Sequence, residues 1–176
     1  MSKDVKAQRE DEVFDIVDHL DRVVGRATRG KVHQCQLWHR AIHVLVFDRA
    51  GRVLLQKRSM LKDSAPGRWD SSCSGHLDAG EDYAPAARRE LGEEIGLTGE
   101  FDLKPWLRIE ARKETGWEFV WVYRVAHSGP FQAHPAEIDR LEWWETLRVT
   151  RALTARPDDF APAFRYLWTK LAKEIG

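Results

Sequence analysis

Residues 75–97 have the sequence GHLDAGEDYAPAARRELGEEIGL, and this stretch decides the fold. Five residues separate Gly75 from Glu81, seven more separate Glu81 from Arg89, and a run of glutamates follows. Helix-forming residues dominate from Tyr83 to Ile95. Apolar side chains recur there at three- and four-residue steps and predict a buried stripe of Ala84, Ala87, Leu91 and Ile95. The pattern therefore predicts a loop followed by an amphipathic helix.

Three glutamates of this helix carry the chemistry. Glu90 and Glu94 are four residues apart and Glu93 is three from Glu90, so all three carboxylates lie on one side of the helix. Like charges at that spacing repel by about 0.2–0.5 kcal/mol per pair, and a divalent cation removes the repulsion. Hard oxygen ligands of this kind suit Mg²⁺ or Mn²⁺. A solvated acidic face is the other interpretation of these glutamates, but it does not account for the whole spaced pattern.

The pattern, complete from Gly75 to Leu97, resembles the signature box of the Nudix hydrolases. The resemblance implies an α/β fold, the Nudix α/β/α sandwich with a mixed central sheet. It also implies that residues 13–176 form a single domain. Residues 1–12 are almost wholly polar and are expected to be a flexible N-terminus.

The same resemblance assigns roles to individual residues of the box. Glu90 and Glu94 are implied to be metal ligands, Glu93 a ligand or a catalytic base, and the Gly75 carbonyl a further ligand. The cofactor is then Mg²⁺, with Mn²⁺ as a substitute. Arg89 is grouped with the catalytic residues, because its guanidinium can clamp a carboxylate in two-point geometry and hold a metal ligand in place.

Composition narrows the class of protein. At 176 residues with 43% hydrophobic content, the chain suits one domain with a full core. Basic and acidic residues are equal at 28 each, so no basic footprint predicts a nucleic-acid duplex as partner. The sequence has no apolar run of membrane-spanning length and no signal-peptide pattern, and its two cysteines are too few for a disulfide framework. These features favour a cytoplasmic protein with reduced cysteines.

Periodicity and turn residues predict the remaining elements. Two short strands, Val13–Val17 and Val23–Thr28, are expected to form an N-terminal β-hairpin, a surface on which two copies can pair as a homodimer. Further strands are expected over Ala41–Asp48, Val53–Arg58, Ser71–Ser74, Trp106–Glu114, Glu118–Val125 and Leu141–Glu145. Helices are expected over Leu147–Ala155 and Phe160–Ile175.

Residues outside the box resemble type I isopentenyl-diphosphate isomerases and the hydrolases most similar to them, over about residues 38–96. The matching segments are His39-Arg40-Ala41, Leu55-Gln56-Lys57-Arg58, Pro66-Gly67-Arg68-Trp69-Asp70 and Ser74-Gly75-His76. The isomerases bind the diphosphate with an Arg and a Lys that fall on Arg58 and Lys62. Two cations near the metal would neutralise a charged diphosphate, so both are substrate-binding candidates. Ordinary surface charge is the other interpretation.

The resemblance to the isomerases is incomplete. They carry a catalytic cysteine where this chain has Ser74, and Cys73, one residue earlier on a strand, points to the opposite face. A hydroxyl is a far poorer acid–base group than a thiol near neutral pH. Ala163 also stands near the position where an isomerase commonly has a tryptophan.

The histidines leave two interpretations open. His39, His76 and Glu118 match three isomerase metal positions, but Gly116 replaces the carboxylate expected two residues before Glu118. Either histidine alone can equally well satisfy a backbone carbonyl. His43 alternates with apolar residues on an expected strand and is interpreted as packing.

Glu137 is a second candidate for the catalytic base, beside Glu93. It precedes an expected strand that contains Trp143, and Nudix enzymes often place a glutamate on such a loop. That glutamate can orient or deprotonate the attacking water.

Together these features predict a Mg²⁺-dependent hydrolase that cleaves a diphosphate linkage in a nucleoside diphosphate derivative or a related organic diphosphate. A small-molecule diphosphate is the expected partner, with no nucleic-acid duplex and no membrane. The alternatives are isopentenyl-diphosphate isomerisation and a catalytically silent Nudix module that senses a nucleotide.

Overall fold

The computed structural model describes residues 10–175 as strands and helices in close alternation. The strands are β1 (Val13–Val17), β2 (Val23–Thr28), β3 (His39–Phe47), β4 (Val53–Arg58), β5 (Trp69–Asp70), β6 (Cys73–His76), β7 (Lys104–Ile109), β8 (Glu118–Ala126) and β9 (Ile138–Trp144). The helices are α1 (Arg29–Cys35), α2 (Tyr83–Ile95), α3 (Thr146–Ala155) and α4 (Pro162–Ile175), with short 3₁₀ turns η1 (Lys113–Thr115) and η2 (Pro157–Asp159).

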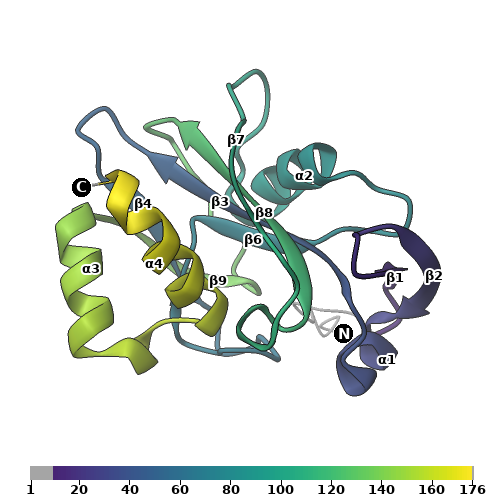
Figure 1. Cartoon of the computed structure of the whole chain (residues 1–176). Helices are drawn as coiled ribbons and strands as arrows, with labels where there is room; N and C mark the ends of the chain where they lie inside the picture. Colours follow the sequence, from purple (N-terminus) through teal and green to yellow (C-terminus); the bar gives the residue numbers. More distant parts are fainter. Residues whose placement is uncertain (1–9, 176) are drawn as a thin grey trace, which may run out of the picture.

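A mixed β-sheet with helices on both faces forms the centre of the molecule (Figure 1). Its strands follow the order β5-β4-β3-β8-β7, with β6 paired to β3 and β9 paired to β4. Helix α2 packs on one face, while α3 and α4 pack on the other (Figure 1). The α/β/α sandwich with a mixed central sheet is therefore confirmed.

Strand β3 brings distant polar residues together. It runs parallel to β8, with His39 opposite Glu118, and antiparallel to β6, with Ala41 opposite His76. Side chains alternate between the two faces of a strand. The register therefore places His39, His76 and Glu118 at neighbouring positions on one end of the sheet.

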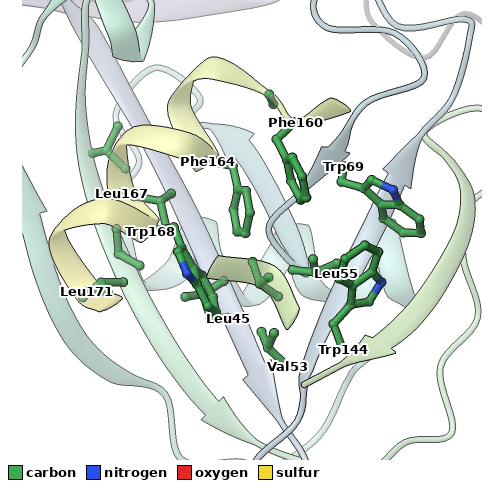
Figure 2. Close-up of a cluster of buried hydrophobic side chains, with 14 of the residues drawn as sticks. Leu45, Val53, Leu55, Trp69, Trp144, Phe160, Phe164, Leu167, Trp168 and Leu171 are labelled. Carbon is green, nitrogen blue, oxygen red and sulfur yellow. The ribbon is translucent and has the colours of Figure 1, made fainter. Parts of the chain in front are cut away.

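Side chains alternate between the two faces of each strand, and the apolar ones form two separate hydrophobic cores. Figure 2 shows the first, in which Leu45, Val53 and Leu55 of the sheet meet aromatic and aliphatic side chains of the α4 region. Trp69 and Trp144 pack edge to face there, with ring centroids 5.1 Å apart. The second core lies under α2. Both cores consist of fully or nearly fully buried side chains, so they hold the sheet rigid beneath the polar residues at its end.

The N-terminal hairpin β1–β2 is confirmed and stands apart from the main sheet as its own two-stranded sheet. Its first strand is fastened to the loop before α2: the amide of Gly80 donates to Asp15 Oδ2 at 2.7 Å, and the amide of Ala79 to the carbonyl of Val13 at 3.0 Å. Asp21, in the hairpin turn, accepts hydrogen bonds from Arg40 Nε at 2.7 Å and Tyr83 Oη at 2.8 Å. The hairpin therefore forms a fixed wall beside α2.

Several element boundaries differ from those expected. The short helix α1 is not foreseen by the sequence pattern, because Val32 is its only buried apolar residue. In α2, Ala87, Leu91 and Ile95 are buried as expected, but Ala84 is exposed and Ala86 is buried instead. Helix α4 begins at Pro162 rather than Phe160, since proline is favoured in the first turn, where its missing amide is not needed.

Two further expectations concern the N-terminal segment and membrane-spanning helices. Residues 1–9, most of the segment expected to be flexible, lie outside the described residues; the carbonyls of Glu10 and Glu12 accept hydrogen bonds from Gly30 and Arg29 at the start of α1. Within residues 10–175, no helix has the length and apolar character needed to cross a bilayer.

Candidate active site

A cavity of about 1200 Å³ lies at the end of the sheet, between α2, the N-terminal segment and the loop after β4. Its walls include every site residue predicted from the sequence, namely Arg58, Lys62, Gly75, Arg89, Glu90, Glu93, Glu94 and Glu137. The box residues come from β6 and α2, and the others come from two loops far away in the sequence. The fold thus brings the predicted residues into one place.

Arg89 is the central cation of the glutamate row. Its Nε and Nη2 donate to the two oxygens of Glu81 at 3.0 and 2.8 Å, the two-point geometry expected of it. Its Nη1 donates to Glu90 Oε1 at 2.8 Å and to Glu93 Oε2 at 3.1 Å. Burial alone would lower the pKa of Arg89, but the hydrogen bonds to Glu81 and the charge of Glu90 raise it above its usual value. Arg89 therefore positions the carboxylates around it.

The three glutamates of α2 have unequal surroundings. The side chain of Glu94 is 4% exposed and that of Glu90 is 13% exposed, whereas that of Glu93 is 61% exposed. Burial, together with the nearby charge of Glu94, raises the pKa of Glu90 to about 8. Burial also raises the pKa of Glu94. A divalent cation between these two carboxylates would offset the cost of ionising them, and carboxylate oxygens are the ligands that a hard cation prefers.

Gly75 lies directly against Glu90. A Cβ added at Gly75 would overlap the carboxylate of Glu90, so no other residue lets the strand approach so closely. The glycine of β6 and the carboxylates of α2 therefore form one continuous cradle, and the residues present fit the Mg²⁺ or Mn²⁺ that the sequence predicts.

Lys62 and Glu137 form an ion pair with each other at the edge of the cradle. Lys62 is 7% exposed, and its Nζ lies 3.9 Å from Glu94 Oε1. The two loops are also joined through the backbone, because the amide of Ser59 donates to the carbonyl of Glu137 at 2.9 Å. The sequence predicts both residues at the site but gives no sign of this pairing.

Arg58 borders the cavity with its guanidinium held by protein acceptors. Its Nη1 donates to Asp70 Oδ2 at 3.0 Å, while Nε and Nη2 donate to the carbonyl of Ser64 at 3.0 and 2.8 Å. These bonds fix the loop that carries Lys62. His43 is buried as expected, but it also lines the cavity, with Nδ1 2.7 Å from Ser71 Oγ and 3.7 Å from Asp70 Oδ1.

A second polar cluster occupies the other end of the cavity. One ring nitrogen from each of His33, His39 and His76 lies within 4.8 Å of the others. Glu118 Oε1 lies 2.9 Å from His76 Nε2 and 3.5 Å from His39 Nε2. His39 Nδ1 bonds to the carbonyl of Leu37 at 2.8 Å, and Nε2 is buried with no hydrogen-bond partner in the described part of the chain. An imidazole nitrogen that makes no hydrogen bond, lies 3.5 Å from a carboxylate oxygen and faces two other imidazoles fits a metal ion.

The charges of this cluster favour the same interpretation. Burial lowers the pKa of His76 to about 4, so the imidazole is neutral near pH 7, the form that binds a metal. Burial would raise the pKa of Glu118, but His76 and His39 outweigh it and hold the pKa well below its usual range. Sequence reasoning identified His39, His76 and Glu118 but missed His33. The only sequence feature that points to His33 is its position shortly before His39, as a third histidine.

Cys73 and Ser74 point to opposite faces of β6, as expected. Cys73 is fully buried in the core under α2, and burial raises the pKa of its thiol well above the usual value. Ser74 lines the cavity, and its amide donates to Glu94 Oε2 at 3.1 Å. The residue that faces the cavity at this point of β6 is therefore a serine.

Comparisons with known proteins agree with the fold. The family model described as the NUDIX domain matches residues 37–164. The chain is 36% identical over 152 residues to an uncharacterized Nudix hydrolase of Yersinia pestis, covering 86% of this chain and 80% of that protein. It is 33% identical over 169 residues to an isopentenyl-diphosphate Δ-isomerase of Serratia proteamaculans, covering 94% of this chain and 92% of that protein.

A solved structure supports the fold independently. A crystal structure of a Deinococcus radiodurans protein superimposes with a TM-score of 0.74 at 24% identity, covering 82% of this chain and 90% of that one. At this identity the likeness bears on the fold alone. The family match, the relatives and the complete glutamate box together establish that this chain belongs to the Nudix family.

Proposed function

We propose that this chain is a Mg²⁺-dependent pyrophosphohydrolase that cleaves the diphosphate linkage of a nucleoside diphosphate derivative or a related organic diphosphate. The observation that carries the proposal is that the buried Glu94 lies beside Glu90, whose side chain is 13% exposed, with Gly75 directly against Glu90 and Arg89 bonded to Glu90. Nudix domains support this kind of activity, whereas relatives named as hydrolases and isomerases leave the substrate open. We expect the reaction to take place in the cytoplasm.

Glu90, Glu94, Glu93 and the Gly75 carbonyl are the groups that would hold the metal. When bound, a divalent cation at this position would neutralise diphosphate charge and lower the pKa of a water molecule. Arg89 keeps Glu90 and Glu93 in place by bonding them and Glu81 at the same time. Glu94 is held separately, because its Oε2 accepts from the amide of Ser74 and from Gln56 Nε2. The carboxylates are thereby oriented before any ligand arrives, which is the condition for strong electrostatic stabilisation.

The proton of the attacking water passes to Glu93 or to Glu137. Glu93 is the more exposed, and one of its oxygens accepts from Arg89. Glu137 is paired with Lys62, so it becomes a free base when Lys62 turns to the substrate. The diphosphate would accept hydrogen bonds from Lys62 and Arg58, which stabilise the charge that develops as the phosphorus–oxygen bond breaks.

A substrate screen tests the proposal. The full-length protein is incubated with Mg²⁺ and with nucleoside di- and triphosphates, dinucleoside polyphosphates, nucleotide sugars, NADH, coenzyme A or prenyl diphosphates. Products are identified by chromatography and phosphate assay. We expect cleavage between two phosphorus atoms of at least one class, abolished by excess chelator. Full activity in chelator, or no turnover of any class, would overturn the proposal.

Isopentenyl-diphosphate isomerisation is the second candidate, and the cluster of His33, His39, His76 and Glu118 favours it. Ser74 and the fully buried Cys73 speak against it, because no thiol faces the cavity from β6. Incubation with isopentenyl diphosphate separates the two. Formation of the dimethylallyl isomer without phosphate release would favour the isomerase.

A further inference from the structure

Gln56 is a buried polar residue that takes no part in the proposed chemical steps. It lies on β4, is 0% exposed, and its Nε2 donates a hydrogen bond to Glu94 Oε2 at 3.2 Å. Glu94 Oε2 also accepts from the amide of Ser74 at 3.1 Å. An ionised carboxylate can only accept, so the nitrogen of the Gln56 amide is the atom that faces it.

The two oxygens of Glu94 therefore have different surroundings. Two uncharged donors, on β4 and β6, hold Oε2 in place. Oε1 is directed toward Lys62, whose Nζ is 3.9 Å away, and both residues line the cavity. A carboxylate held at one oxygen in this way presents the other to a cation at a fixed angle.

Burying the polar side chain of Gln56 costs free energy, and apolar packing alone does not account for its presence. Its Oε1 is buried without a hydrogen-bond partner among residues 10–175, and a buried unsatisfied amide oxygen destabilises a folded protein. Its neighbours Leu54 and Leu55 are buried hydrocarbon side chains, so packing alone would accept an apolar residue here, and the hydrogen bond to Glu94 is what distinguishes Gln56 from them. A buried polar group that is only half satisfied calls for another reason.

We infer that Gln56 is a positioning residue, which holds Glu94 so that Oε1 is presented to a divalent cation. This inference rests on the proposed function, in which Glu94 is a metal ligand. Outer groups of this kind typically change metal affinity by about 10–100-fold when they are removed. Gln56 would thus act through Glu94 without touching the metal or the substrate.

The test is Mg²⁺ binding to the full-length protein by isothermal titration calorimetry. Gln56→Met keeps the length of the side chain and removes the donor, and Gln56→Leu is the second variant. We expect Mg²⁺ affinity to fall by about 10–100-fold in both, while the thermal unfolding midpoint changes little, because Glu94 Oε2 keeps the amide of Ser74 as a donor. The matched control is Gln132→Met, at an exposed position beside Gly96, which should bind Mg²⁺ like the wild type.

The outcomes separate this inference from the proposed function. A wild-type protein that binds no Mg²⁺ at millimolar concentration would remove the proposed function itself. If the wild type binds and Gln56→Met binds equally well, Gln56 has no positioning role. If affinity falls only in variants whose unfolding midpoint also falls, Gln56 supports the fold, and the inference is again overturned.

Discussion

The two ends of the cavity differ in where their residues come from and in the atoms they offer. At the first end the carboxylates of Glu90, Glu93 and Glu94 all belong to α2. At the second end the imidazoles and the carboxylate of Glu118 belong to α1, β3, β6 and β8. Carboxylate oxygens suit Mg²⁺ and Mn²⁺, whereas imidazole nitrogens suit Zn²⁺ and other transition metals. One cavity therefore holds two candidate cation sites of different selectivity.

Strand β6 connects the two ends. Gly75 lies against Glu90, and the next residue, His76, belongs to the imidazole cluster. The carbonyl of His76 accepts a hydrogen bond from Arg89 Nη2 at 3.0 Å. A change at one end can therefore be tested for its effect at the other.

Glu94→Gln should have the largest effect, confined to the carboxylate end. The substitution keeps the size of a buried side chain and removes a charged ligand. A bound metal supplies several kcal/mol of charge stabilisation in the transition state, and each 1.36 kcal/mol is a factor of ten. We expect kcat/KM on the substrate found in the screen to fall by about 10³-fold, with an unchanged circular dichroism spectrum.

The control for this variant is Glu100→Gln, which makes the same change at an exposed position outside the cavity. It should retain wild-type kcat/KM. Normal turnover by Glu94→Gln would contradict a metal role for Glu94, whatever the control does.

The two ends of the cavity also differ in how much of each can be predicted from the sequence. The glutamates of the carboxylate end lie within 23 consecutive residues, so spacing predicts their helix and the face they share, while the resemblance to the Nudix box implies their roles as ligands. Helix α2 and strands β1, β2 and β4 begin and end where periodicity places them. In these elements the local helix and strand periods agree with the tertiary contacts of the fold.

The remainder depends on contacts between distant segments. His33 enters its cluster only because α1 folds back on the hairpin, where the amide of Arg29 bonds to the carbonyl of Glu12 at 2.7 Å. With one buried apolar residue, α1 has no helical period to detect. The pair Lys62 and Glu137 joins residues 75 positions apart through two loops. No short-range sequence pattern predicts the position of His33 or the contact between Lys62 and Glu137.

Arg89→Lys tests whether the clamp or only the charge matters at the carboxylate end. Lysine keeps the charge but cannot bond two oxygens of Glu81 while also reaching Glu90. We expect kcat to fall by about 10–100-fold and the Mg²⁺ concentration for half-maximal rate to rise. Arg88→Lys is the control, because Arg88 is exposed and bonds only the carbonyl of Phe101 among the described residues. Equal activities in the two variants would show that charge alone suffices.

His33→Gln tests the independence of the imidazole end. Removing one of three converging nitrogens should weaken Zn²⁺ binding by at least about tenfold, measured by competition with a chromophoric chelator. Mg²⁺ binding, measured by calorimetry, should not change. His19→Gln, at an exposed position of the hairpin, is the matched control. Loss of Mg²⁺ affinity in His33→Gln would mean that the two ends form one site.

Asp21→Asn should have the smallest effect and tests how the hairpin supports the imidazole end. Asp21 joins the hairpin turn to Arg40 and Tyr83, and Phe14 on the same hairpin stacks on His39 and His76. Loss of one largely buried charge-assisted bond should lower the free energy of unfolding by about 1–3 kcal/mol, measured in urea. Asp102→Asn, whose ion pair with Lys104 is exposed, should change the free energy of unfolding by less than about 0.5 kcal/mol.

If the hairpin orders the imidazoles, Asp21→Asn also weakens Zn²⁺ binding. Mg²⁺ binding stays constant, because the carboxylates are held by α2 and β6 rather than by the hairpin.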